Sequence, residues 1–94
     1  MYAKEATFVL QNGDDFNSLI PDEATVVYFT DEIMPETASL INVDDDGDCG
    51  VVAWMDGTVM KVSSQISDVN VIANQNCKNM FNKKINLSEV YLII

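Results

Sequence analysis

The sequence predicts a mainly β fold: a small domain of antiparallel hairpins with at most one or two short helical turns. Three observations support this class. The apolar runs are short, they are rich in β-branched and aromatic residues, and turn-forming residues separate them. No segment keeps the 3.6-residue period of an amphipathic helix. With 94 residues, of which 48% are hydrophobic, the chain is expected to form a single domain over residues 1–94.

Strands are expected at three places in the first half of the chain. Each is rich in residues of high β propensity and is bounded by turn residues or acids: Ala6–Leu10, Ala24–Thr30 and Ser39–Val43. The dipeptide Asn12-Gly13 predicts a turn after the first of them. The stretch "FNSLIPDEA" then holds a single helical turn. It must stop before Pro21, because the residue that precedes a proline avoids the helical region.

The stretch "VVAWMDGTVMKV" carries the strongest hairpin signal. Asp56-Gly57 lies between two apolar runs, as the two-residue loop of a type I′ turn does. Because side chains alternate between the two faces of a strand, simple pairing separates two sets of residues. The core-like face holds Val51, Ala53, Met55, Thr58, Met60 and Val62. The other face is mixed and holds Val52, Trp54, Val59 and Lys61.

The segment "DVNVIANQNCKNMFNKKINLSEVYLII" is expected to run as a strand over Val69–Ala73, a short turn or 3₁₀ segment, and a last strand at Val90–Ile94. An exposed apolar edge strand promotes aggregation. The last strand is therefore expected to pair within the domain or with a second copy in a homodimer.

Charge is the strongest compositional signal. The chain has 15 acids and 5 bases, a net charge of −10, and every base is a lysine. Thirteen of the acids lie in residues 1–60, beside Lys4 alone. Proteins that bind nucleic acids or anionic membranes need cationic groups, so neither is an expected direct partner. A basic protein surface would be attracted instead. The alternative is that the charge only keeps a small domain soluble.

The ionisable side chains give little support for catalysis. The chain has no histidine, which removes the commonest general base, the usual zinc ligand and the histidine-paired nucleophiles. Cys49 and Cys77 show no metal or redox spacing and are expected to be buried, reduced thiols, with one disulfide as the alternative. No glycine-rich phosphate loop occurs. We therefore expect no enzyme activity, no catalytic residue and no cofactor.

The acidic stretch "INVDDDGDCGVVA" partly matches a calcium loop. With Gly47 at the sixth position, Asn42, Asp44 and Asp46 take the first, third and fifth positions. The twelfth position, which needs a bidentate glutamate, is Ala53, so the EF-hand interpretation fails. An acidic turn is the favoured interpretation. A looser, oxygen-rich calcium site is the alternative, and no metal site is predicted.

The sequence shows neither a secretory signal peptide nor a transmembrane segment. The N-terminal "MYAKEATFVLQNGDD" contains an early acid and no long apolar core, unlike a secretory signal peptide. No apolar run approaches the roughly 20 residues that a transmembrane helix needs. The expected location is the cytoplasm, and the host cell cytoplasm if the chain is encoded by a phage.

From residue 26 onward the chain resembles a known family. "FTDEIMPETASLINVDDDGDCGVVAWMDGTVMKVSSQ" and "VIANQNCKNMFNKKINLSEVYLI" are similar to the leading segment and first repeat of BspA-like bacterial leucine-rich-repeat surface proteins. The repeat spacing is matched by Cys77, Met80, Phe81, Leu87, Val90 and Leu92. The resemblance implies parallel strands stacked in a solenoid, an adhesive or binding role, and no catalysis. It also implies core positions for Met80, Phe81, Leu87 and Leu92.

The chain departs from that family because it holds about one repeat, whereas several are normally needed to bury a solenoid core. Two interpretations are open: the chain is a fragment of a longer repeat protein, or the leading module and first repeat are free-standing. The last segment is then expected to look like one leucine-rich repeat attached to a β domain.

Two functions follow as hypotheses. The first is a non-enzymatic acidic inhibitor from a phage or mobile element, similar to anti-CRISPR proteins, that mimics nucleic acid and blocks a basic surface of a host protein. The second is a capping or adhesive module of a bacterial surface or phage tail leucine-rich-repeat protein. Trp54 is interpreted either as core or as an interface anchor. The predicted partner-binding residues are Asp14, Asp15, Asp22, Glu23, Asp31, Glu32, Asp44, Asp45, Asp46, Asp48, Trp54 and Asp56.

Overall fold

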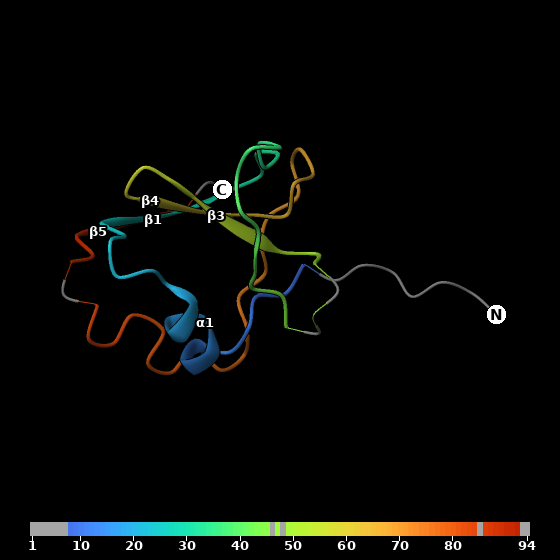
Figure 1. Cartoon of the computed structure of the whole chain (residues 1–94). Helices are drawn as coiled ribbons and strands as arrows, with labels where there is room; N and C mark the ends of the chain where they lie inside the picture. Colours follow the sequence, from blue (N-terminus) through green and yellow to red (C-terminus); the bar gives the residue numbers. More distant parts are fainter. Residues whose placement is uncertain (1–7, 46, 48, 85, 93–94) are drawn as a thin grey trace.

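The computed structural model describes residues 8–45, 47, 49–84 and 86–92. In these residues the chain forms one mixed five-stranded sheet and one short helix (Figure 1). The expected mainly β class is confirmed. The elements are α1 (Gly13–Leu19), β1 (Val26–Thr30), β2 (Ile41–Asn42), β3 (Val52–Asp56), β4 (Val59–Ser63) and β5 (Glu89–Leu92).

The strands lie in the order β2-β3-β4-β1-β5, so β1 lies between β4 and β5. The pairs β2–β3 and β3–β4 are antiparallel. β1 is parallel to both of its neighbours, which corrects the expectation of antiparallel hairpins alone. Parallel neighbours need long connections. β2 and β3 lie between β1 and β4 in the chain, and all of residues 31–88 lie between β1 and β5.

The β3–β4 hairpin has the two faces that the sequence predicts. Ala53 pairs with Val62 and Met55 with Met60, all on the core side. The loop differs by one residue, because Asp56 pairs with Val59 and leaves Gly57 and Thr58 in the turn. Gly57 has a φ of +64°, and Thr58 has no positive φ. The predicted type I′ turn at Asp56-Gly57 is therefore wrong, since that type needs a positive φ at both loop residues.

The core lies between α1 and one face of the sheet. Its buried members are Leu10, Phe16, Ile20, Ala24, Val27, Val43, Val51, Ala53, Met60 and Val62. The Phe16 ring of α1 lies 6.2 Å from the Phe29 ring of β1 and makes an edge contact with the Phe81 ring, also at 6.2 Å. Phe16 thus joins the sheet to the C-terminal segment.

α1 extends the predicted single helical turn to seven residues. Asn12 begins it, with its side-chain oxygen accepting a hydrogen bond from the Asp15 N–H at 2.9 Å. Gly13 lies against the backbone of Cys77 and Lys78, where a Cβ atom would overlap with the carbonyl groups. No helix in the described ranges has the length and apolar character that crossing a bilayer requires.

Asparagine side chains tie the irregular segment 70–84 and Asn86 to the rest of the chain, and Figure 1 shows residues 70–84 passing α1. The Asn17 amide donates to the carbonyl oxygens of Met80 and Asn82, at 3.2 and 2.9 Å. The Asn86 amide donates to the Asp22 carbonyl oxygen at 2.9 Å. Backbone groups that lack a strand partner are thus satisfied by side chains.

Two predicted strands are reduced to isolated bridges. Ala6–Leu10 and Val69–Ala73 contribute one parallel bridge, between Val9 and Ile72, and Leu10 bridges Asp44. Residues 6–7 lie outside the described ranges. The Asn74 amide donates to the Leu10 carbonyl oxygen at 3.1 Å, which takes an acceptor that a ladder would use.

Candidate functional site

β5 forms one edge of the sheet. On its inner side it pairs with β1, with Val27 opposite Val90 and Tyr28 opposite Tyr91. Within the described residues no strand pairs with its outer side. Val90 is 40% exposed and Tyr91 is 49% exposed, so this edge presents backbone groups beside apolar side chains. The last strand therefore pairs within the domain, and the homodimer remains a prediction. Residues 93–94 of the predicted Val90–Ile94 edge lie outside the described part.

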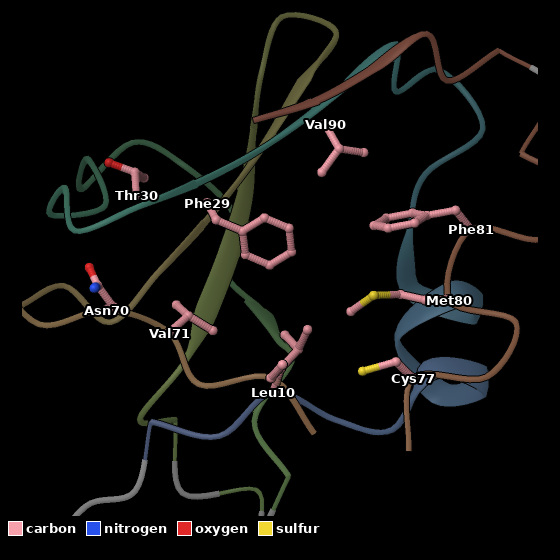
Figure 2. A pocket seen from close by; sticks show the side chains of 10 residues that line it. Leu10, Phe29, Thr30, Asn70, Val71, Cys77, Met80, Phe81 and Val90 are labelled. Carbon is pink, nitrogen blue, oxygen red and sulfur yellow. The ribbon is translucent and has the colours of Figure 1, made fainter. Parts of the chain in front are cut away.

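An apolar cavity of about 400 Å³ opens beside β5. In Figure 2, Phe29 of β1 and Phe81 point toward one another across it, and Val90 points in from β5. Two polar residues, Thr30 and Asn70, lie on one side. A volume of this size lies within the range of roughly 300–1,000 Å³ that is usual for binding pockets. The complete lining is Leu10, Phe29, Thr30, Asn70, Val71, Ala73, Cys77, Met80, Phe81 and Val90.

Local sequence patterns do not reveal this cavity, because its lining comes from segments that are far apart in the chain. The resemblance implies only core positions for Met80, Phe81 and Leu87, of which the first two line the cavity. These three side chains are partly buried and pack against the core. The fourth expected residue, Leu92, belongs to β5.

The second face of the sheet carries a row of four side chains across β3, β4, β1 and β5. Register places them side by side in the order Trp54, Lys61, Tyr28, Tyr91. The Tyr28 and Tyr91 ring centroids are 6.1 Å apart. Exposure differs between the two ends: Trp54 is 2% exposed, whereas Tyr91 is 49% exposed. Trp54 thus occupies the buried position that the core interpretation expected.

The connector after β1 lies against the Trp54 end of this row. Ile33, Pro35 and Ala38 of the connector line a hollow together with Trp54 and Lys61. Tyr28 and Tyr91 do not line this hollow. Tyr91 is the exposed member of the row, whereas Tyr28 and Lys61 are half-buried and Trp54 is buried.

Lys61, in the middle of the row, binds two of the predicted acidic residues. Its Nζ lies 3.0 Å from Glu32 Oε1 and 3.5 Å from Asp56 Oδ2. The hydrogen bond that Lys61 donates to Glu32 raises the pKa of Lys61 above its ordinary value of 10.5, against the opposing effect of desolvation, and Asp56 acts in the same direction as Glu32. Glu32 and Asp56 are therefore partly neutralised within the protein.

Asp44 does not belong to the exposed acidic surface. It is 1% exposed, and its Oδ2 accepts a hydrogen bond from the Val51 N–H at 3.0 Å. Its own N–H donates to Asn42 Oδ1 at 3.1 Å. The buried Asp44 carboxylate thus stabilises the acidic turn by a hydrogen bond with its backbone. Asp46 and Asp48 of the same turn lie outside the described residues.

The remaining predicted acids lie in separate places. Asp14 and Asp15 stand in the first turn of α1. Asp22 and Glu23 follow that helix and are exposed. Two others make structural contacts: Asp31 Oδ2 accepts from the Asp68 N–H at 2.7 Å, and Asp45 Oδ1 accepts from the Asn74 amide at 3.0 Å. The structure therefore brings Glu32 and Asp56 together at Lys61, and does not gather all twelve predicted residues on one surface.

The cysteines differ from expectation in their burial. Cys49 and Cys77 are both free, and both are exposed; the expectation of buried thiols is wrong. Cys77 Sγ donates to the Asn74 carbonyl oxygen at 2.9 Å. Among the residues that the structure describes, no three or more histidine, cysteine or carboxylate side chains are grouped closely enough to hold a metal ion.

The edge strand β5, the apolar cavity and the tyrosine pair lie together at one end of the sheet, where Val90 is 40% and Tyr91 49% exposed. They offer backbone hydrogen bonds, a hollow for a side chain and flat aromatic surface. Comparisons of the chain with protein-family models, with curated proteins and with solved structures found no match.

Proposed function

We propose that this protein is a non-enzymatic protein-binding module that receives an extended segment of a partner along β5. The observation that carries this proposal is the position of β5, which has an unpaired outer side within the described residues and half-exposed Val90 and Tyr91. Strand addition to an open sheet edge is a recurrent way of binding peptides: backbone hydrogen bonds supply affinity and side-chain pockets supply specificity.

The cavity supports the same proposal. Val90 belongs both to β5 and to the cavity lining, so a segment bound at the edge would pass the cavity mouth. Side chains of an added strand alternate between the two faces. Those on the cavity side would meet Phe29, Phe81 and Val90, and would favour apolar anchors.

The test is selection of peptides from a displayed random library, followed by affinity measurement on two variants. Val90→Lys places a charge at the edge and the cavity mouth, whereas Val90→Thr keeps the shape. We expect selected peptides to bind Val90→Lys at least about ten-fold more weakly, as the loss of one buried apolar anchor predicts, and Val90→Thr nearly as well as the native protein. Binding should also slow amide hydrogen exchange in β5. Peptides that bind both variants equally, without that protection, would refute the proposal.

The acidic-inhibitor hypothesis specifies a partner, and the net charge of −10 supports it. Under this proposal the module acts in the cytoplasm on a basic, nucleic-acid-binding host protein. Exposed carboxylates that remain for this role include Asp14, Asp15, Asp22 and Glu23. We expect the combined replacement of the three aspartates by Asn and of Glu23 by Gln to abolish salt-sensitive inhibition of such a protein. Variants of β5 should weaken the binding of this module to the host protein. Inhibition that changes neither with salt concentration nor with this replacement would contradict the acidic-inhibitor hypothesis.

The leucine-rich-repeat hypothesis is the second candidate, and the parallel β1–β5 ladder supports it. Stacked repeats form such ladders, and Met80, Phe81 and Leu87 pack against the core. Under this proposal a further repeat would continue the ladder beyond β5. Appending one leucine-rich repeat after Ile94 should then raise the free energy of unfolding and slow hydrogen exchange in β5. No gain in stability would count against a capping role.

Self-association is a third outcome to measure. Two copies could pair through β5, but both carry a net charge of −10 and repel one another at low salt. Light scattering should therefore report a monomer at low salt. If high salt produces a dimer that Val90→Lys abolishes, the partner of β5 is a second copy.

A further inference from the structure

We infer that the tyrosine face of β1 and β5 recognises an arginine side chain on the partner's extended segment. The site consists of the Tyr28 and Tyr91 rings and the Glu89 carboxylate. This inference rests on the proposed strand addition at β5 and names the chemistry of the bound segment.

The rings form a platform at the open end of the four-residue row. Tyr28 and Tyr91 lie side by side in register, with centroids 6.1 Å apart and planes inclined by 47°. Tyr91 is 49% exposed. An aromatic face attracts a cation within about 6 Å of the ring centroid. Guanidinium groups are planar and weakly hydrated, so they stack on rings better than ammonium groups do.

The surrounding charges favour a cation. Glu89 lies two residues before Tyr91 in β5, so both side chains point to the same face. No cation pairs with Glu89 among the described residues. Lys61, the lysine of the row, is already held by Glu32 and Asp56. The three carboxylates outnumber this one ammonium group, so the face carries net negative charge.

Geometry then sets the pattern of the bound segment. A strand beside β5 presents alternate side chains to the tyrosine face and to the cavity face. The tyrosine face selects arginine, which can stack on a ring and form a bidentate pair with Glu89. The cavity face, with Phe29, Phe81 and Val90, selects an apolar side chain. The occupant is therefore an extended segment in which arginine and apolar residues alternate.

The experiment compares three synthetic peptides that share alternating valines. The other positions carry arginine, lysine or citrulline, and citrulline keeps the shape of arginine without its charge. Isothermal titration should give the order arginine, lysine, citrulline, with citrulline about ten-fold weaker than arginine because it loses both the ring attraction and the ion pair.

Protein variants assign the site. Tyr91→Leu keeps apolar area but removes the ring, and should weaken the arginine peptide about two- to five-fold. Tyr91→Phe keeps the ring and should bind nearly normally. Glu89→Gln should weaken the arginine peptide and leave the citrulline peptide unchanged. Asp22→Asn, an exposed acid that follows α1, is the matched charge control and should have little effect.

Each outcome has a distinct meaning. If all three peptides bind equally and protect β5 amides from exchange, strand addition stands and the arginine site is refuted. If no peptide protects β5, both proposals fall. If a soluble oligosaccharide binds and Tyr91→Leu abolishes that binding while the peptides do not bind, the tyrosine pair is a sugar platform and the inference is overturned.

Discussion

The Asp44 carboxylate accepts a hydrogen bond from the Val51 N–H, 3.0 Å away, where the side chain is almost fully shielded from solvent. Removing it leaves a buried donor without this partner, so Asp44→Ala should lower the free energy of unfolding by about 1–3 kcal/mol. Urea denaturation at neutral pH measures this. The exposed Asp22→Ala serves as control and should change stability by less than about 0.5 kcal/mol. Equal effects of the two replacements would show that Asp44 is only part of a solvated turn.

Gly13 should resist replacement although it lies in a helix. Alanine normally stabilises a helix relative to glycine by about 1 kcal/mol. Here a Cβ atom would overlap with the backbone of Lys78 and Cys77, so Gly13→Ala should destabilise the protein by about 1–3 kcal/mol. Thermal unfolding beside Ser18→Ala, an exposed position in the same helix, provides the comparison. A stabilised Gly13→Ala would mean that segment 77–78 does not pack on α1.

The ion pairs of Lys61 should produce a stability difference at high pH. Its pKa is raised in the folded state, so the contribution is fully present below 10.5, the ordinary value, and is lost as pH rises through the raised pKa. Relative to Lys61→Gln, the native protein should be more stable by about 0.2–1 kcal/mol at neutral pH. That advantage should disappear in strongly alkaline solution. A stability difference that stays constant as the pH rises would contradict the assignment.

Trp54 should behave as a buried residue. Iodide should quench its fluorescence weakly until urea unfolds the chain, and Trp54→Ala should cost about 3–5 kcal/mol of stability. Trp54→Phe, which retains an aromatic ring, is the milder control. If Trp54→Ala leaves stability intact and weakens partner binding, the residue is an interface anchor after all.

The sequence predicts elements well where a local pattern decides them. The β-branched run around Val27 forms a strand, and the apolar alternation of Ala53 and Met55 places the correct face inward. The sequence predicts the turn one residue too early, because the β-branched Thr58 reads as a strand residue, whereas register leaves it in the loop with Gly57. Composition also overestimated the acidic surface, since it cannot distinguish the buried Asp44 from the exposed Asp22.

The candidate site was largely beyond reach of local patterns. Its parts meet only because β1 pairs with β5. These two strands are separated by residues 31–88, so no short stretch of sequence contains both. Tyr28 and Tyr91 are ordinary strand residues until register places one beside the other. The repeat-like spacing gave a partial guide, since it selected Met80, Phe81 and Leu87 as residues that pack inward. Nothing in that spacing indicated a cavity.

The position of β1 also determines when the sheet can be completed. Its neighbours on both sides are made later: β4 follows β3 in the chain, and β5 ends at Leu92. During synthesis β1 can therefore pair with β4 only after residue 63 has left the ribosome, and with β5 only after nearly the whole described chain has done so. Pairings between such distant segments slow folding and prolong the exposure of unpaired strand edges. A nascent chain stalled before Glu89 should consequently depend on chaperones that shield β1.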